Sequence, residues 1–385
     1  MGTYLNPGTA EARREESAPC SSSGELVQTG TTAGRLSSAE RADRHATVSA
    51  ALTTMDDERL MTMLRSAPRR AAGIGGSCAL VDVGGVSVWV KQVPLTAMER
   101  DEDVAGSTAN TFGLPTFFHY GLGSVGAGAW REVAAHEMAT EWALEGKGDG
   151  VTLLHHWRVL PLPQGAQQPW ADRSELDTTV EFWHNSSAVR ERLTALATAP
   201  ATVALFMEHQ PATLHTWLAG QLGPDRLESA LDMVEHELLA IAGLLRHNGM
   251  VHFDAHFENI LTDGHRLYLT DFGLASASRF DLSAAERSFL RRNDSHDVSF
   301  VVTQLVNWLV TEFAGTTLRE DRVDYVRQCA HGDQARRLPA PAATIVERYA
   351  PIAAVLNDFY GRLLLESRAI PYPATTLDAL CAGLT

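Results

Sequence analysis

The pattern of apolar and polar positions changes along the 385-residue chain, with strand-like segments first and helical segments later. In the stretch CALVDVGGVSVWVKQV, valines alternate with other residues after a Gly84-Gly85 turn, which predicts a β-hairpin. The apolar run ATVALFMEH predicts a further strand. Helical patterns predict helices over 226–248, 295–313 and 341–366. This order predicts an α+β fold, with a small β-rich part followed by a larger helical part.

The remaining segments indicate how the chain is divided. The N-terminal segment is rich in Ser, Thr, Gly, Ala and Glu and has no repeating apolar face, which is typical of disorder. A helical pattern follows, in which Asp56 and Asp57 are well placed to start a helix. We predict a disordered segment (1–36), an N-terminal helical extension (37–70), a β-rich part with one key helix (71–208) and insertions at 95–130 and 163–200, and a helical part (209–385).

Composition and charge narrow the classes of partner. The formal net charge of −15 argues against a nucleic-acid surface, because neutralising phosphates requires a clustered positive field. No apolar run approaches the roughly 18 residues that span a bilayer, and the N-terminus has no apolar segment typical of a secretory signal. The four cysteines are far apart, which predicts reduced thiols and neither a disulfide framework nor a zinc site. We expect a soluble, cytoplasmic protein with no nucleic-acid or membrane partner.

Polar residues gather in the stretch MVHFDAHFENILTDGHRLYLTDFG, which begins at Met250. Asp254 and Asn259 lie on a predicted loop, and a hairpin through Asp263-Gly264 leads to Asp271. Asp254, Asn259 and Asp271 can thus meet at one end of a two-stranded ribbon. Amide and carboxylate oxygens are suitable ligands for Mg²⁺, which binds few protein oxygens together with substrate phosphates. Asp254 then remains to accept a proton from, or orient, an attacking hydroxyl.

This stretch resembles the catalytic and metal-binding loops of the protein-kinase-like superfamily. His252-Phe253-Asp254 is similar to the His-Arg-Asp motif, and Asp271-Phe272-Gly273 is similar to the Asp-Phe-Gly motif. The resemblance implies a two-lobed fold, ATP and Mg²⁺ as cofactors, Asp254 as a catalytic residue, and Asn259 and Asp271 as metal ligands. His256 stands where protein kinases usually carry Lys, and we include it among the catalytic candidates. The pattern His-x-Asp-x-His-x-x-Asn is similar to that of aminoglycoside and other small-molecule phosphotransferases.

A strand lysine and a helix glutamate are also expected from this resemblance. Lys91, in VWVK, resembles the lysine that holds the nucleotide phosphates and is the third catalytic candidate. The predicted helix offers Glu132, Glu137 and Glu141. Glu137 lies at about the kinase distance ahead of the next strand, so we predict that it orients Lys91. Glu141, on the same helix face, is the alternative.

Further residues resemble nucleotide-binding positions. Trp89 is predicted either to stack on adenine or to pack in the core. The segment from Met207 resembles a kinase hinge that offers backbone groups to adenine, and the glycines before the first hairpin resemble a phosphate-covering loop. The cofactor-binding candidates are Lys91, Glu137, Gly73, Gly75, Gly76, Trp89, Met207, Glu208 and His209. Asp297 is expected to hold the backbone of the catalytic loop.

The motifs do not determine whether the hydroxyl acceptor is a protein or a small molecule. The segment between Asp271 and Asp297 is short and lacks the Ala-Pro-Glu motif of protein kinases, whereas the complete Asp-Phe-Gly and the hinge favour a protein kinase. We expect an ATP-dependent phosphotransferase, with an atypical Ser/Thr protein kinase preferred. A small-molecule (antibiotic or metabolite) phosphotransferase and a nucleotide-binding pseudokinase are the alternatives. The glycine- and aromatic-rich segment 95–130 is predicted to pack over the small part, or to form a flap over the cleft or an acceptor-recognition surface.

Overall fold

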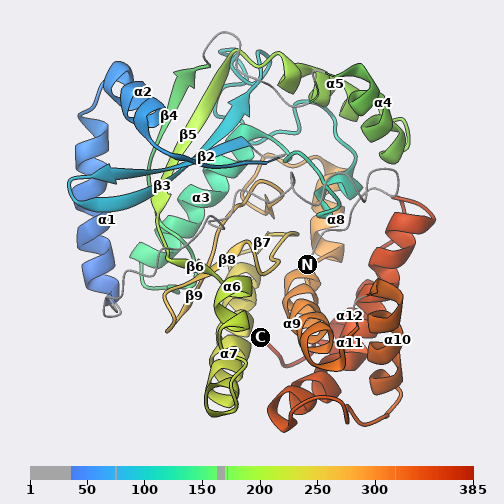
Figure 1. Ribbon diagram of the computed structural model, residues 1–385. Helices are drawn as coiled ribbons and strands as arrows, with labels where there is room; N and C mark the ends of the chain where they lie inside the picture. Colours follow the sequence, from blue (N-terminus) through green and yellow to red (C-terminus); the bar gives the residue numbers. More distant parts are fainter. Residues whose placement is uncertain (1–35, 74–75, 163–169, 171, 317) are drawn as a thin grey trace.

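The computed structural model describes residues 36–73, 76–162, 170, 172–316 and 318–385 (Figure 1). The predicted disorder of residues 1–36 therefore falls almost entirely outside the described residues, as does Gly75. A small antiparallel sheet with its helices is followed by a larger helical part (Figure 1), so the predicted α+β class is confirmed.

The sheet has five strands in the order β1-β2-β3-β5-β4, each antiparallel to its neighbours. The β2–β3 hairpin turns at Gly84 and Gly85, whose φ angles are 63° and 85°. A two-residue turn with positive φ at both positions matches the twist of the flanking strands, and glycine adopts it without steric cost. The predicted hairpin is confirmed. The strands are β1 (Arg69–Gly73), β2 (Gly76–Val83), β3 (Val86–Leu95), β4 (Leu154–Pro161) and β5 (Ala201–Glu208).

Helices cover both faces of this sheet. α1 (Ser38–Thr53) and α2 (Asp57–Ser66) pack on one face, and Asp56 caps α2 as the predicted start of that helix. α3 (Ala129–Leu144) packs on the opposite face. Side chains alternate along a strand, so Phe206 of β5 joins the core under α1 and α2, whereas its neighbour Leu205 joins the core under α3.

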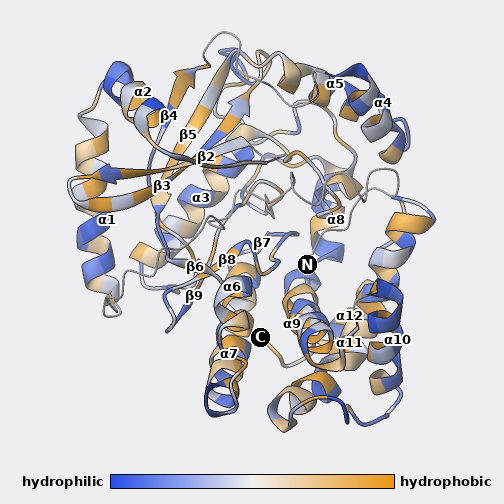
Figure 2. Ribbon diagram, viewed as in Figure 1, coloured by the Kyte–Doolittle hydropathy of each residue, from blue (hydrophilic) through white to orange (hydrophobic). Residues whose placement is uncertain are grey.

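The helical part surrounds α9, which is buried over most of its length and packs against α7, α10 and α11. Helices predicted over 226–248, 295–313 and 341–366 are confirmed as α7, α9 and α11. Apolar residues concentrate on β3, β5 and these inner helices (Figure 2). The elements are β6 (Ala212–Thr213), α6 (Leu214–Ala219), α7 (Pro224–His247), β7 (Met250–Val251), β8 (Ile260–Thr262), β9 (Leu267–Leu269), β10 (Ser276–Ala277), α8 (Ala284–Arg292), α9 (His296–Ala314), α10 (Arg319–Ala330), α11 (Ala340–Leu365) and α12 (Ala374–Leu380).

The two predicted insertions have different structures. The segment 95–130 is mostly irregular, with a short 3-10 helix η1 (Thr116–His119), and leads into the start of α3. Its side chains Phe118, Tyr120 and Leu122 belong to the core cluster that contains the large helices, whereas Leu95 and Trp130 at its two ends belong to the core under α3. The prediction that it packs over the small part is therefore correct only for its ends. The second insertion contains α4 (Arg173–Phe182) and α5 (Ser187–Ala197).

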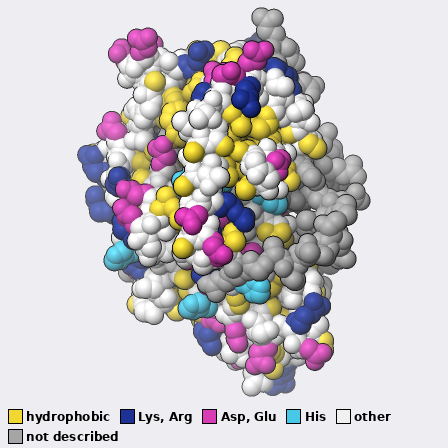
Figure 3. Space-filling model, turned by 90° about the vertical axis from the view of Figure 1, so that its left-hand side faces the viewer, with side chains coloured by type: hydrophobic (Ala, Val, Ile, Leu, Met, Phe, Trp, Pro, Cys, Tyr) yellow, Lys and Arg dark blue, Asp and Glu magenta, His cyan; other side chains and the backbone are white. Residues whose placement is uncertain are grey.

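Two expectations from composition, on the cysteines and on membrane-spanning segments, can be compared with the structure. Cys78 is disulfide-bonded, so the prediction that all cysteines are reduced is wrong, while Cys329 and Cys381 are free and buried. No single helix among the described residues is long and apolar enough to cross a membrane, and α9 with α10 meets that criterion only as a pair bent by 107°. Basic and acidic side chains are interspersed on the face that carries α1 (Figure 3).

Candidate functional site

The candidate site is centred on Lys91, a buried residue of β3 at the junction of the two parts. Its Nζ lies 2.8 Å from Glu132 Oε1 of α3 and 2.7 Å from Asp271 Oδ1. Only 4 % of the Lys91 side chain is exposed, against 26 % for Asp271. Desolvating a charge is costly unless it is paired, and here two carboxylates provide the pairing. Lys91 thus joins three segments that are far apart in the sequence.

The charges at this junction determine one another's protonation. Burial acts to lower the pKa of Lys91, but the charges of Asp271 and Glu132 outweigh it and raise the pKa above its ordinary value. Burial likewise acts to raise the pKa of Asp271, and the Lys91 charge outweighs it and lowers that pKa to about 2. Both groups are therefore charged at neutral pH.

The backbone of the loop that carries Asp254 is hydrogen-bonded to the carboxylate of Asp297, near the start of α9. Its Oδ2 accepts a hydrogen bond from His252 N at 2.7 Å, and its Oδ1 accepts one from Phe253 N at 3.1 Å. The anchoring role predicted for Asp297 agrees with these bonds. Phe253 and Asp271 both have positive φ angles, 67° and 61°, which non-glycine residues adopt only when their surroundings impose it. Two of the five described non-glycine residues with positive φ are therefore the predicted metal ligand Asp271 and the neighbour of the predicted catalytic Asp254.

His252 connects this loop to the chain before Asp271. Its Nδ1 accepts from Asp254 N at 3.2 Å, so the neutral ring carries its proton on Nε2, which lies 3.1 Å from Thr270 O. Thr270 N donates in turn to Asn259 O at 3.0 Å. These bonds hold Asp254, Asn259 and Asp271 in one cluster, as predicted from the motif.

Asn259 is oriented by the loop that carries Asp254. Its Nδ2 donates to Asp254 O at 3.0 Å and lies 3.3 Å from Asp254 Oδ2. The amide oxygen is therefore turned away from Asp254, and Lys91 pairs with one oxygen of Asp271 and leaves the other. One amide oxygen and one carboxylate oxygen fit Mg²⁺ bound mainly by phosphates and water. In the described part of the chain, no group of three or more His, Cys, Asp or Glu side chains is suited to hold a metal.

Asp254 and His256 differ in how they face the site. Burial, opposed by His252 and supported by the nearby Asp271 charge, raises the pKa of Asp254 to about 7, although 24 % of its side chain is exposed. A carboxylate with a pKa near neutrality is suited to exchange a proton at physiological pH. His256 Nδ1 accepts from Glu258 N at 3.2 Å, which places the ring proton on Nε2, 3.8 Å from Asp254 Oδ2. Burial lowers the pKa of His256, so the ring lies beside Asp254 as a neutral group.

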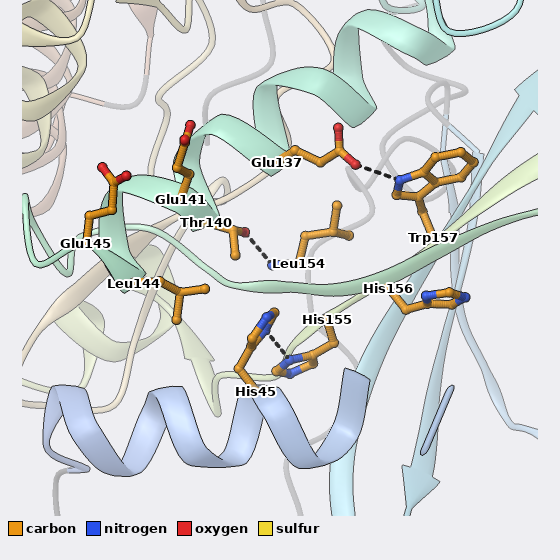
Figure 4. A pocket seen from close by; sticks show the side chains of 10 residues that line it. All are labelled: His45, Glu137, Thr140, Glu141, Leu144, Glu145, Leu154, His155, His156 and Trp157. Carbon is orange, nitrogen blue, oxygen red and sulfur yellow. Dashed lines mark hydrogen bonds between the residues drawn. The ribbon is translucent and has the colours of Figure 1, made fainter. Parts of the chain in front are cut away.

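Glu137 does not pair with Lys91, so that prediction is wrong. Its carboxylate accepts from Trp157 Nε1 at 2.8 Å on another side of α3 (Figure 4), and the alternative, Glu141, pairs with Arg279 at 2.9 Å. Five residues separate Glu132 from Glu137, which corresponds to a rotation of about 140° around the helix. The partner of Lys91 is Glu132, in the first turn of α3.

The predicted Glu137 instead lines a separate pocket of about 510 Å³ between α1, α3 and β4 (Figure 4). His45 and His155 meet there with their Nδ1 atoms 3.1 Å apart. The lining includes none of Lys91, Asp254 and Asp271, so this pocket is distinct from the candidate site.

The glycine candidates lie at one end of the sheet. Gly73 ends β1 and pairs with Gly76 at the start of β2, so these two glycines flank a hairpin, whereas Gly75 lies outside the described residues. A Cβ on Gly76 would lie 2.1 Å from Gln92 O, and its φ is 133°. Both constraints require glycine here for structural reasons.

The hinge candidates have defined partners. Trp89 is paired with Met207 across β3 and β5, packs partly buried against the core under α3, and lies 6.5 Å from the His209 ring. Glu208 donates its backbone amide to Leu153 O at 2.8 Å, and its carboxylate pairs with Arg41 of α1. The Glu208 amide is therefore occupied within the protein, and the availability of the other backbone groups of this segment to adenine stays a prediction.

Sequence reasoning missed three residues next to the site. Arg131 precedes Glu132, and its Nη2 lies 2.7 Å from Glu286 Oε1 of α8. Arg41 ties α1 to the hinge candidate, and the backbone of Gly121 lies against Asp254. Glu132 lies in the first turn of α3, and its helical position was the signal from the sequence that made it one of the possible partners. No local pattern indicates Gly121.

The site thus combines a buried lysine between two carboxylates, a separate carboxylate with a pKa near 7, and an oriented amide. This set can hold an anionic group beside Lys91, bind a hard cation through Asn259 and Asp271, and accept a proton at Asp254. In comparisons with known proteins, no family model and no curated protein matches this chain.

Proposed function

We propose that this protein is an ATP-dependent phosphotransferase with a protein-kinase-like, two-lobed fold, which transfers the γ-phosphate to a hydroxyl acceptor. The observation that carries the proposal is Lys91, which pairs at once with Glu132 at 2.8 Å and Asp271 at 2.7 Å. A buried lysine held between a helix carboxylate and a candidate metal-binding carboxylate is suited to position phosphates. The hydrogen bonds that orient Asn259 beside Asp254 support the same function.

Each residue has a distinct role in this proposal. Lys91, oriented by Glu132, would neutralise the nucleotide phosphates, and Asn259 and Asp271 would hold Mg²⁺, which neutralises charge on the transferred group. Asp254 accepts the proton of the hydroxyl while the hydroxyl oxygen forms a bond to the γ-phosphorus. The bond between that phosphorus and the β–γ bridging oxygen breaks, and ADP leaves with the electron pair. His256 lies beside Asp254 as a neutral group that limits its movement.

The test is Mg·ATP binding and turnover by the full chain. We expect wild-type protein to bind Mg·ATP in calorimetry and to release ADP, and Asp271→Asn to lose metal-dependent binding. Asp254→Asn should keep binding and lose roughly 100-fold or more in turnover, within the range for a general base. Asp378→Asn, an exposed acid on α12, is the matched control. Wild-type protein that binds no Mg·ATP would exclude the proposal, and binding without any turnover would indicate a nucleotide-binding module instead.

A further inference from the structure

Gly121 lies in direct contact with the carboxylate of Asp254. A Cβ built on Gly121 would be 2.2 Å from Asp254 Oδ1 and 2.9 Å from its Cγ. Real Cβ atoms do not approach other heavy atoms that closely, so any other residue would displace the carboxylate or itself. The chain around Gly121, residues 119–127, is here called the 119–127 segment. It belongs to the irregular region that sequence patterns left without a defined position.

The 119–127 segment is fixed to the chain that follows Asp271. His119 Nδ1 lies 2.8 Å from Leu274 O, and Ala127 N donates to Gly273 O at 2.9 Å. Tyr120 OH donates to Asn293 Oδ1 at 2.9 Å, just after α8, and its ring packs edge-on against Phe253. Only 6 % of His119 and 2 % of Tyr120 is exposed. Buried rings with hydrogen bonds at both ends of the segment make it a fixed wall, not the flap considered from the sequence.

The two oxygens of Asp254 face different surroundings. Oδ2 lies near Asn259 Nδ2, at 3.3 Å, and His256 Nε2, at 3.8 Å. Oδ1 faces Gly121, and within the described residues it takes no hydrogen bond. A side chain at position 121 would collide with this oxygen, so glycine lets the segment pack directly against the carboxylate. An incoming hydroxyl needs a heavy-atom distance of about 2.6–3.2 Å to the base, and Oδ1 is the oxygen available for that contact.

The chain after Asp271 has few free backbone groups for an extended peptide. The carbonyls of Gly273 and Leu274 accept bonds from the 119–127 segment, as described above. Ser276 and Ala277, which form β10, pair with β7. Asp281 N donates to Thr108 Oγ1 at 2.8 Å. Adding a peptide strand requires a row of unpaired N–H and C=O groups, and these bonds occupy the segment where that row would lie.

We propose that the 119–127 segment is the acceptor-side wall of the site, and that the acceptor is a small hydroxyl compound and not an extended polypeptide. This inference rests on the proposed phosphotransferase function. Gly121 is then a positioning residue, because its missing side chain lets this wall pack directly against Asp254 and so limits the directions from which an acceptor hydroxyl can reach the carboxylate. A small acceptor needs no such pairing edge, whereas a strand-like peptide lacks a docking edge beside the wall.

The experiment uses full-length protein with Mg·ATP and two sets of acceptors. One set contains sugars, amino sugars, polyols and nucleosides, and the other contains Ser/Thr peptides. Basal ATP hydrolysis, in which water is the acceptor, is measured alongside. Gly121→Ala should reduce transfer and hydrolysis about 100-fold, as expected when a reacting group is misplaced by about 1 Å. Its affinity for Mg·ATP should stay within a factor of about two, since that affinity depends mainly on the phosphate- and metal-binding groups Lys91, Asn259 and Asp271.

Gly223→Ala is the matched control, because a Cβ there meets nothing closer than the Arg226 guanidinium at 3.9 Å. Tyr120→Phe removes only the hydrogen bond to Asn293. If Gly121→Ala fails to fold, this second variant tests whether the 119–127 segment forms the acceptor side of the site. It should raise the acceptor KM several-fold and leave Mg·ATP affinity unchanged.

The outcomes separate the inference from the proposed function. Transfer to peptides at rates equal to or above those of small compounds would overturn the acceptor class while leaving the phosphotransferase proposal intact. If both Gly121→Ala and Tyr120→Phe left hydrolysis and transfer unchanged, the proposal that the 119–127 segment forms the acceptor-side wall would be contradicted. Loss of hydrolysis with intact Mg·ATP affinity supports the wall even if no compound in the set is accepted. No Mg·ATP binding by wild-type protein would remove the proposed function and this inference together.

Discussion

Arg131 Nη2 lies 2.7 Å from Glu286 Oε1, and both side chains are almost completely buried, with 2 % and 5 % exposed. Arg131 Nε also donates to Thr108 O at 2.6 Å. The next residue along α3, Glu132, pairs with Lys91. One turn of α3 is therefore attached to α8, to the irregular segment before it, and to the candidate phosphate-binding lysine. This arrangement makes the position of Glu132 depend on a contact with the helical part.

The Arg131–Glu286 pair should be important for stability. Arg131→Met leaves the Glu286 carboxylate buried without its partner, and we expect the free energy of unfolding to fall by about 3–5 kcal/mol. Urea unfolding followed by circular dichroism measures this change. Arg327→Met, which breaks the exposed pair with Asp324, is the control and should change stability by less than about 1 kcal/mol. A similar small effect for Arg131→Met would show that the buried pair is not needed. Arg131→Met should also weaken Mg·ATP binding, since Glu132 loses its fixed position.

The two glutamates of α3 should differ clearly in function. Glu132→Gln removes a charge-assisted contact with Lys91 worth about 1.5–3 kcal/mol, so Mg·ATP binding should weaken by roughly 10- to 100-fold. Glu137→Gln changes a side chain that bonds Trp157 and should leave binding unchanged. Calorimetric titration of both variants with Mg·ATP makes the comparison. Equal losses in both variants would contradict the assignment of Glu132 as the lysine partner.

Stability should depend on pH through His119. Burial, together with the Arg131 charge, lowers the pKa of His119 to about 4, against opposing effects of the Leu274 carbonyl and Glu286. Between pH 6.5 and about 4 the unfolded chain binds a proton at this histidine and the folded chain does not. The free energy of unfolding therefore falls as the pH drops through this range, by up to about 3 kcal/mol from this group.

His119→Gln should remove this contribution and flatten the dependence of stability on pH between 6.5 and 4. Urea titrations at half-unit pH intervals measure the slope. His247→Gln, at an exposed position near the end of α7, is the matched control. His136 and His155 are also buried with pKa values lowered to about 3, so a reduced slope should persist in the variant. An unaltered slope in His119→Gln would be evidence against a neutral buried ring at this position.

Asp297 should be required to hold the loop that carries Asp254. Asp297→Ala leaves the backbone amides of His252 and Phe253 without their acceptor, and unsatisfied buried groups cost about 1–3 kcal/mol each. We expect lower stability, and faster hydrogen exchange at residues 252 and 253 than in wild-type protein. Asp294→Ala, three residues earlier in an exposed pair with Arg246, is the control. Exchange rates equal to those of wild type would show that another group anchors the loop.

Much of the architecture followed from local patterns in the sequence. Alternating valines and the Gly84-Gly85 pair predicted the β2–β3 hairpin, and helical patterns predicted α7, α9 and α11 within two residues at each end. The cluster of Asp254, Asn259 and Asp271 was also predicted, because the three lie within one short loop–hairpin unit. In each case the interactions that define the element join residues close in the chain, so their spacing is sufficient to indicate the structure.

Contacts between distant segments were harder to predict. The sequence offered three glutamates on α3, and their spacing alone did not indicate which would face Lys91. That choice depends on where α3 begins, and α3 begins at Ala129, whose amide donates to the carboxylate of the distant Glu99 at 2.9 Å. The disulfide of Cys78 was missed for a related reason, since cysteine spacing shows neither distance nor orientation.

The sequence by itself therefore determined the α+β class, the main helices and strands, and the chemical identity of the candidate catalytic and metal-binding residues. Only the tertiary structure decided that Glu132 is the partner of Lys91 and that Gly121 lies against Asp254. Residues 91 and 132, like residues 121 and 254, are far apart in the chain, and no local periodicity relates them. Packing of the irregular 95–130 segment into the large core brings these residues together.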